Sequence, residues 1–175
     1  EDELDFIKKE LFPMFDLKPG LVDKLSNEED VFIRLTEEQK RIMISHSKQR
    51  KVFFEGRAGT GKTIVAKSLA EEKAAQGLKV MFLCFNEELA SFMDLNLKEV
   101  DVFYFHQLSK ELCEKAGIDW QVPSDSKDRE DFYNIECNDL LIEALEKLPG
   151  ERWDVIVVDE AHDLKKDWWL SVHEL

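Results

Sequence analysis

A glycine-rich octapeptide, GRAGTGKT at residues 56–63, restricts the possible folds of this chain more than any other feature. It satisfies the pattern G-x-x-x-x-G-K-[ST] in full, follows an apolar run and opens a strongly helical segment. Glycines allow a tight turn whose backbone N–H groups point at phosphate oxygens, and the helix beginning at Lys62 adds the positive end of its dipole. The pattern predicts a phosphate-binding loop between a strand and a helix.

The last two side chains of this loop predict its ligands. Lys62 is expected to reach the β- and γ-phosphates of ATP, and the Thr63 hydroxyl is expected to ligate Mg²⁺. The alternative is a glycine-rich turn without a ligand, but a chance match in a chain of this size is expected at about one per cent or less. The predicted nucleotide-binding residues of the loop are Gly56, Arg57, Ala58, Gly59, Thr60, Gly61, Lys62 and Thr63.

Apolar runs alternate with helical segments along most of the chain. The unbroken run at 78–85 is typical of a strand covered on both faces. This alternation predicts an α/β fold of three αβα layers around a mainly parallel sheet. We expect strands at 51–55, 78–85, 100–105 and 153–158, helices at 64–76, 86–97, 106–117 and 135–148, and irregular structure at 119–131.

Two carboxylates follow the last predicted strand, at the edge of an open α/β sheet where ligands bind. Asp159 is placed to hold Mg²⁺, and Glu160 to orient and deprotonate the attacking water. Acidic residues also follow strands as helix caps, and Asp163 has that alternative. Together with the loop, this motif predicts Lys62 and Glu160 as catalytic residues, and Thr63 and Asp159 as metal ligands.

Composition limits the class of protein and its partners. The net charge of −14 argues against a simple nucleic-acid-binding module, which usually carries a basic face. No apolar run is long enough for a membrane span. The cysteines, Cys84, Cys113 and Cys137, lack metal spacing, so we expect reduced thiols and a cytoplasmic location.

The ends of the chain differ from its centre. Residues 1–35 form an acidic lead-in, predicted to be helical packing or linker segments, and residues 36–175 are the predicted ATP-binding domain. A small helical insertion is expected at about 112–150. Because the chain begins without Met and ends inside a stretch that reads as helix, we expect it to be a fragment of a larger protein.

Several segments, in order, carry a resemblance to a known family. LTEEQ at 35–39, GRAGTGKT, FLCFNEELA, FYFHQL and VVDEAHDL together resemble the UvrD/Rep-like superfamily-1 DNA helicases over residues 35–165. The DEAH spelling is shared with superfamily 2, but the upstream LTEEQ favours superfamily 1. The lead-in and the DWW segment resemble the branch in which a nuclease-related (NERD) domain precedes the helicase. The resemblance implies a RecA-like fold for the first, ATP-binding lobe.

The resemblance also implies roles for individual residues. Gln39 would read the adenine edge, although Thr36-x-x-Gln39 is also a capping box. Asn86, Phe105 and His106 would lie on the track for single-stranded DNA, where backbone contacts combine with aromatic stacking. Phe105 has a core residue as its alternative, and His106 a satisfied polar residue. His162 occupies a position that couples the ATP state to the DNA state, with a structural histidine as its alternative.

The resemblance implies an ATP-dependent DNA helicase or translocase in the full-length protein. Its implied partners are single-stranded DNA, a second RecA-like lobe outside this chain and a fused nuclease domain. Because arginines from the second lobe accelerate phosphoryl transfer, we expect the fragment alone to bind nucleotide weakly and hydrolyse it poorly. Two alternatives stay open, a P-loop ATPase switch acting on RNA or protein, and a nucleotide-responsive binding module that is not an enzyme.

Overall fold

The structure is a computed structural model that describes residues 39, 41, 43, 45, 49–57 and 59–175. The chain divides into two units, Glu1–Thr36 and Glu37–Leu175, and all described residues belong to the second. The predicted lead-in at 1–35 lies outside the described residues. Gln39, Arg41, Met43 and Ser45 are helical.

Three parallel strands form the sheet of the described part of the chain. They are β1 (Val80–Cys84), β2 (Val100–Tyr104) and β3 (Val155–Val158), in the order β2-β1-β3. Every residue of the central strand β1 is buried. The unbroken apolar run that predicted this strand is explained by its place between two neighbours and two helical layers.

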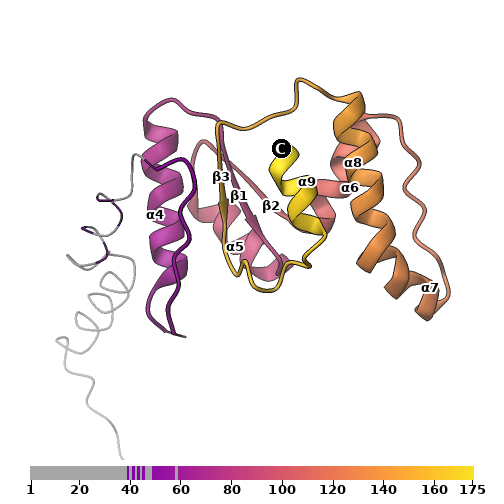
Figure 1. Cartoon of the computed structure of the whole chain (residues 1–175), viewed down its shortest axis with the longest axis horizontal. Coiled ribbons are helices and arrows are strands. Elements are labelled where there is room, and N and C mark those ends of the chain that lie inside the picture. The colour runs from indigo at the N-terminus through magenta and orange to yellow at the C-terminus, as the bar shows by residue number, and fades with distance from the viewer. Residues whose placement is uncertain (1–38, 40, 42, 44, 46–48, 58) are drawn as a thin grey trace, which may run out of the picture. The chain divides into compact units, whose positions relative to one another are not determined.

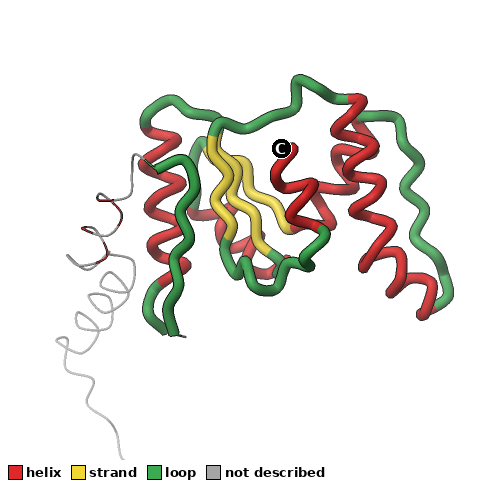
Figure 2. Tube along the Cα trace, viewed as in Figure 1, coloured by secondary structure: helices red, strands yellow, loops and turns green. Residues whose placement is uncertain are grey.

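Helices connect the strands and cover both faces of the sheet (Figures 1 and 2). Gly77 and Gly117 follow α4 and α6 with φ angles of 81° and 69°, the left-handed conformation in which glycine commonly ends a helix. None of the described helices is long and apolar enough to cross a membrane. The helices are α4 (Lys62–Ala75), α5 (Glu87–Asn96), α6 (Phe105–Lys115), α7 (Ser126–Asp131), α8 (Cys137–Lys147) and α9 (Trp168–Glu174), with a π-helical turn, η1 (Phe132–Glu136), before α8.

Alternate residues of β1 enter two separate cores, which confirms the predicted three-layer α/β architecture. Phe82 packs with buried residues of α4 and α5 on one face. Met81 and Leu83 pack with α6, α8 and α9 on the other face. This division follows from the alternation of side chains along a strand, and it places α4 and the C-terminal helices in different layers (Figure 1).

Two predicted elements differ from the structure. Residues 51–55 form no strand, and Val52 and Phe53 are 37% and 77% exposed. An apolar run indicates burial, but a strand also needs a hydrogen-bonded neighbour, and residues 51–55 pair with none of the three strands of the described sheet. The predicted irregular segment at 119–131 contains the short helix α7, whose first N–H groups are capped by the Asp125 carboxylate.

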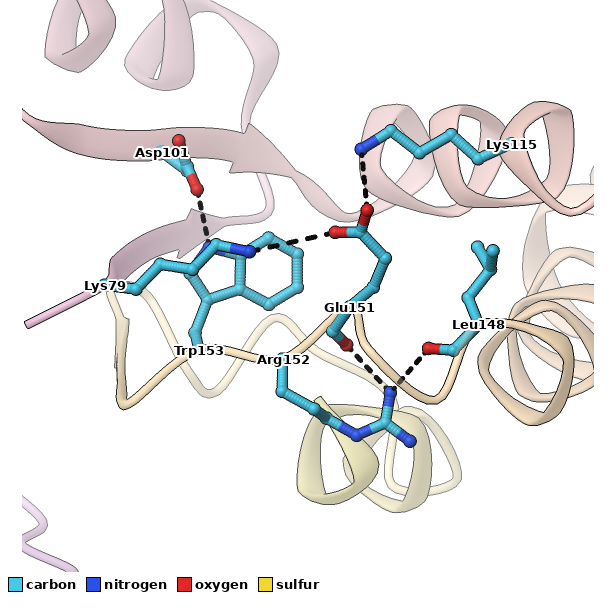
Figure 3. A network of polar contacts seen from close by, with 7 residues as sticks. All are labelled: Lys79, Asp101, Lys115, Leu148, Glu151, Arg152 and Trp153. Atoms are coloured by element: carbon cyan, nitrogen blue, oxygen red, sulfur yellow. Dashed lines mark hydrogen bonds and ion pairs between the residues drawn. The ribbon is translucent and has the colours of Figure 1, made fainter.

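Polar contacts join the amino ends of the strands, the sheet edge opposite the glycine-rich loop (Figure 3). The Trp153 indole N–H, just before β3, donates to Asp101 of β2 at 2.7 Å. Lys79, just before β1, places its ammonium 4.5 Å from the centre of the Trp153 ring and 3.8 Å from Glu151. Lys115 of α6 reaches the same Glu151 carboxylate at 3.4 Å. These contacts connect all three strands and α6, and we assign them a structural role.

The three cysteines are free, as the sequence predicts, and all three are buried. Burial raises the pKa of Cys84 and Cys113 to about 11 and that of Cys137 to about 12, from an ordinary value of 9.0. We therefore expect these thiols to resist Ellman's reagent near pH 8 in the folded chain and to react after denaturation. Their contribution to stability should be complete below pH 9.0 and decline as the pH rises toward the folded values. Rapid modification of the folded chain would contradict this burial.

Candidate functional site

The glycine-rich loop leads directly into α4, as the motif predicts. Gly59 and Gly61 have φ angles of 77° and 81°, in the left-handed region that glycine adopts without strain. A Cβ atom on Gly61 would lie 2.5 Å from Gln39 Nε2, and one on Gly56 would lie 2.7 Å from Thr60 Oγ1. The loop therefore needs glycine at 59 and 61 for its backbone conformation, and a side chain at position 56 would crowd Thr60. Ala58, also a predicted loop residue, lies outside the described residues.

The loop and the first turn of α4 form an environment suited to an anion. Lys62 folds over the loop, and its ammonium donates to the carbonyl oxygens of Gly56 at 3.2 Å and Arg57 at 3.3 Å. Thr60 Oγ1 donates to the same Arg57 carbonyl at 2.8 Å. The first turn of α4 contains no acidic residue, and no described side chain caps it. Its N–H groups and dipole are therefore available to phosphate oxygens.

Gln39 lies against this loop, although it is distant in the sequence. Its side-chain amide donates to the Thr60 carbonyl oxygen at 2.8 Å. Residue spacing alone did not show this contact. The adenine contact of Gln39 stays a prediction, and its capping-box alternative involves Thr36, which lies outside the described residues.

Asp159 is the first of the two carboxylates that follow β3, and it is buried. It is 4% exposed, and its backbone N–H donates to Leu83 O at 2.9 Å, which continues the pairing of β3 with β1. Its Oδ1 accepts from the Glu160 N–H at 3.0 Å, whereas Oδ2 is buried without a hydrogen-bond partner in the described part of the chain. A buried carboxylate oxygen in this state costs about 1–3 kcal/mol, and a hard cation such as Mg²⁺ is a suitable partner. The side chain therefore fits the predicted metal ligand.

Glu160 adopts an uncommon backbone conformation at this point. Its φ angle is 50°, in the left-handed region that residues other than glycine rarely adopt. Where such residues do occur, they cluster at functional sites. Its carboxylate lies 3.4 Å from His162 Nδ1, and His162 Nε2 lies 3.5 Å from Asp163 Oδ1. These exposed pairs contribute little to stability. The Glu160 side chain is half-buried, and its carboxylate faces His162 in the turn that follows β3.

The topology brings the two motifs to one edge of the sheet. The strands are parallel, so β1 and β3 end at the same edge. Helix α4 packs against both strands and begins at that edge, in the lower part of Figure 1. Residues 56–63 and the acidic turn at 159–160 therefore share the carboxyl edge, where open α/β sheets bind ligands.

Two of the predicted DNA-contacting residues have structural roles here. Asn86 caps α5, because its Oδ1 accepts from the N–H groups of Glu88 and Leu89 at 2.7 and 3.1 Å. Phe105 is fully buried and stacks on Trp168, with ring centres 4.0 Å apart and planes inclined by 3°. A ring without solvent exposure presents no face to a base. Phe105 is therefore a residue of the hydrophobic core, the alternative that the sequence analysis left open. The structure does not support its predicted contact with DNA.

His106 is half-buried at the start of α6. Its Nε2 lies 3.1 Å from the Tyr133 carbonyl oxygen of the π-helical turn. Burial lowers the pKa of His106, and nearby Lys165 acts in the same direction, while the hydrogen bond to the Tyr133 carbonyl opposes them. The histidine is therefore neutral near pH 7 and donates to that carbonyl. Its DNA contact stays a prediction, one that relies on polar or stacking interactions instead of charge.

An aromatic cluster around Trp168 was missed by the sequence reasoning. Trp168 opens α9, is 1% exposed, and contacts Phe85 and His106 as well as Phe105. The only sequence signal was a DWW segment closely following the acidic motif. This cluster attaches the segment after Glu160 to residues that follow β1 and β2.

Comparison with protein families identifies the class of this chain. The family model described as type III restriction enzyme, res subunit, matches residues 22–175. The chain belongs to this family. It is therefore a RecA-like P-loop domain of the helicase-like, ATP-hydrolysing kind, and the parallel sheet and loop geometry agree with that class. No curated protein and no solved structure matches the chain.

Proposed function

We propose that this domain is the ATP-binding lobe of a DNA helicase or translocase of the UvrD/Rep-like superfamily-1 kind. One observation carries the proposal. Among the described residues, no side chain caps the start of α4 and none pairs with the buried Oδ2 of Asp159, and these two groups share a sheet edge where Lys62 folds over its loop. An anion site and a cation site at one edge suit a nucleotide triphosphate with its metal.

Each side chain has a defined role in this proposal. Lys62 exchanges its loop carbonyl partners for β- and γ-phosphate oxygens, and loop N–H groups hold the remaining oxygens. Thr63 and Asp159 are the residues that would hold Mg²⁺, which when bound neutralises charge developing on the phosphates. Glu160 orients a water molecule for in-line attack and accepts its proton. Gln39, held against the loop, contacts the adenine edge.

The parts proposed to complete the motor lie outside this domain. A second RecA-like lobe would supply arginines to the transition state. A fused nuclease-related domain and a cytoplasmic location belong to the same proposal. Within the chain, we propose a helical lead-in at 1–35, a RecA-like domain at 36–175 and a small insertion at about 112–150.

A second candidate function is an ATPase switch that acts on RNA or protein. The net charge of −14 favours it, because a DNA-binding surface is usually basic. The superfamily-1 segments and the placement of Asn86 and His106 at the ends of β1 and β2 favour DNA.

ATP turnover of the full-length protein distinguishes these functions. We expect hydrolysis to require Mg²⁺ and to rise at least about tenfold with single-stranded DNA, while residues 1–175 alone turn over ATP slowly because they lack the arginines of a second lobe. Phosphate release should be measured with single-stranded DNA, with RNA of matched sequence and without nucleic acid. Stimulation by RNA alone, or by neither, would reject the DNA motor. Robust DNA-stimulated turnover by residues 1–175 would reject the need for a second lobe.

A further inference from the structure

Helix α5 carries apolar side chains on its outer face as well as on its inner face. Ala90 and Met93 are buried in the core that α5 shares with β1 and β2. On the other side of the helix, Phe92 is 57% exposed and Leu95 is 86% exposed. These two residues, the apolar pair, lie three positions apart and are therefore neighbours on the helix surface. Single exposed apolar residues are common, whereas contiguous ones rimmed by polar groups mark interaction sites.

Exposed carboxylates surround the apolar pair. Glu88 lies on the same face of α5, one turn before the pair. Asp94 flanks the pair, and Glu99 follows the end of the helix. All three side chains are exposed, and Lys98 is the one basic residue of the segment 87–99. The outer face of α5 thus has an apolar centre and a negative rim.

The negative rim determines which kind of partner fits this face. A second copy of the chain, docked symmetrically on the same face, would bring identical carboxylates together, and like charges across an interface are unfavourable. Nucleic acid and anionic membrane surfaces are also negatively charged, so the rim repels both. A protein segment whose apolar side chains are flanked by Lys or Arg complements the centre and the rim together.

We propose that the outer face of α5, centred on Phe92 and Leu95, is a docking surface for a basic amphipathic helix of a partner protein. A helix suits this face because its own side chains can pack between those of α5. Its apolar side chains contact the pair and supply most of the affinity, while its Lys or Arg side chains pair with the rim and accelerate association. The surface lies on the side of α5 that faces away from the sheet, so the inference does not depend on the proposed function.

The test measures binding of a fluorescein-labelled amphipathic helical peptide of leucine and lysine to the full-length protein, by fluorescence anisotropy at several salt concentrations. We expect the double variant Phe92→Ser with Leu95→Ser to weaken binding about tenfold or more, because two apolar contacts are lost. Glu88→Gln with Asp94→Asn should lower the affinity at low salt and make it less dependent on salt. Thermal unfolding should stay close to that of the wild type in both variants, since all four side chains are exposed.

Matched controls separate this surface from the general negative charge of the chain. Ile135→Ser with Leu170→Ser removes two apolar side chains that are 60% and 66% exposed on η1 and α9, and this variant should bind the peptide like the wild type. A peptide with glutamine in place of leucine keeps the lysines, and it should not distinguish the wild type from Phe92→Ser with Leu95→Ser. Equal binding of the leucine–lysine peptide by these two proteins, or no binding by the wild type, would overturn the proposal. A wild-type dimer in light scattering that is lost in the same variant would assign the surface to a second copy instead.

Discussion

Lys62→Ala is expected to lower the affinity of this protein for ATP by at least about 100-fold. A hydrogen bond to a charged group contributes about 1.5–3 kcal/mol, and Lys62 is placed to make such bonds with two phosphate groups. Each 1.4 kcal/mol corresponds to about a tenfold change in affinity. Titration of the full-length protein with a fluorescent ATP analogue, in the presence of Mg²⁺, measures the effect.

The same substitution should leave the fold nearly unchanged. In the structure, the Lys62 ammonium donates only to carbonyl oxygens of an exposed loop, so its loss should change the free energy of unfolding by less than about 1 kcal/mol. Lys67→Ala on the same helix is a matched control, because Lys67 pairs with Glu71 and has no proposed phosphate contact. Wild-type ATP affinity in Lys62→Ala would remove the phosphate-loop interpretation and the proposed function that depends on it.

Glu160→Gln is expected to reduce ATP turnover by about 10²–10⁴-fold, the usual contribution of a positioned general base. Glutamine keeps the size and the hydrogen-bonding capacity of the side chain but cannot accept the proton of the attacking water. Because Glu160 has no proposed contact with the nucleotide, ATP affinity should change less than about threefold. Single-turnover phosphate release and equilibrium nucleotide binding, measured on the same full-length preparation, give both quantities.

Substitutions of two neighbouring carboxylates serve as comparisons in this experiment. Asp159→Asn should weaken nucleotide binding chiefly when Mg²⁺ is present, because its buried Oδ2 is the proposed metal contact. Asp163→Asn should have little effect on either quantity, since Asp163 is exposed and contacts only His162 among its described ion pairs. A Glu160→Gln protein that hydrolyses ATP at the wild-type rate would assign the general base to another residue.

Local sequence patterns were sufficient to predict those parts of the site that depend on local backbone geometry. The glycine spacing at 56–63 predicted a tight turn, in which Gly59 and Gly61 are left-handed, and the start of α4 at Lys62. The apolar run before Asp159 predicted a strand that delivers a carboxylate to the sheet edge, which β3 does. Helix stops at Gly77 and Gly117 were also predictable, because glycine adopts a positive φ angle at little cost.

Tertiary packing decided which apolar and aromatic side chains are buried. Phe85 and Phe105 both end strand segments in the sequence, yet Phe105 is fully buried against Trp168 and Phe85 is 40% exposed. The run at 51–55 is as apolar as a strand, but it pairs with none of the three strands of the described sheet. The contact of Gln39 with Thr60 joins segments that spacing does not relate.

The sequence by itself determined which residues form the phosphate loop and the acidic turn of this protein. The tertiary structure determined which of its side chains are buried and which are exposed. A phosphate loop and an acidic turn are encoded by residues adjacent in the chain, so their patterns are readable without knowledge of distant contacts. Burial, strand pairing and aromatic stacking depend on segments that meet only after folding. The buried Asp159 Oδ2, which has no partner in the described part of the chain, and the partly exposed Phe85 ring are therefore properties of the folded chain.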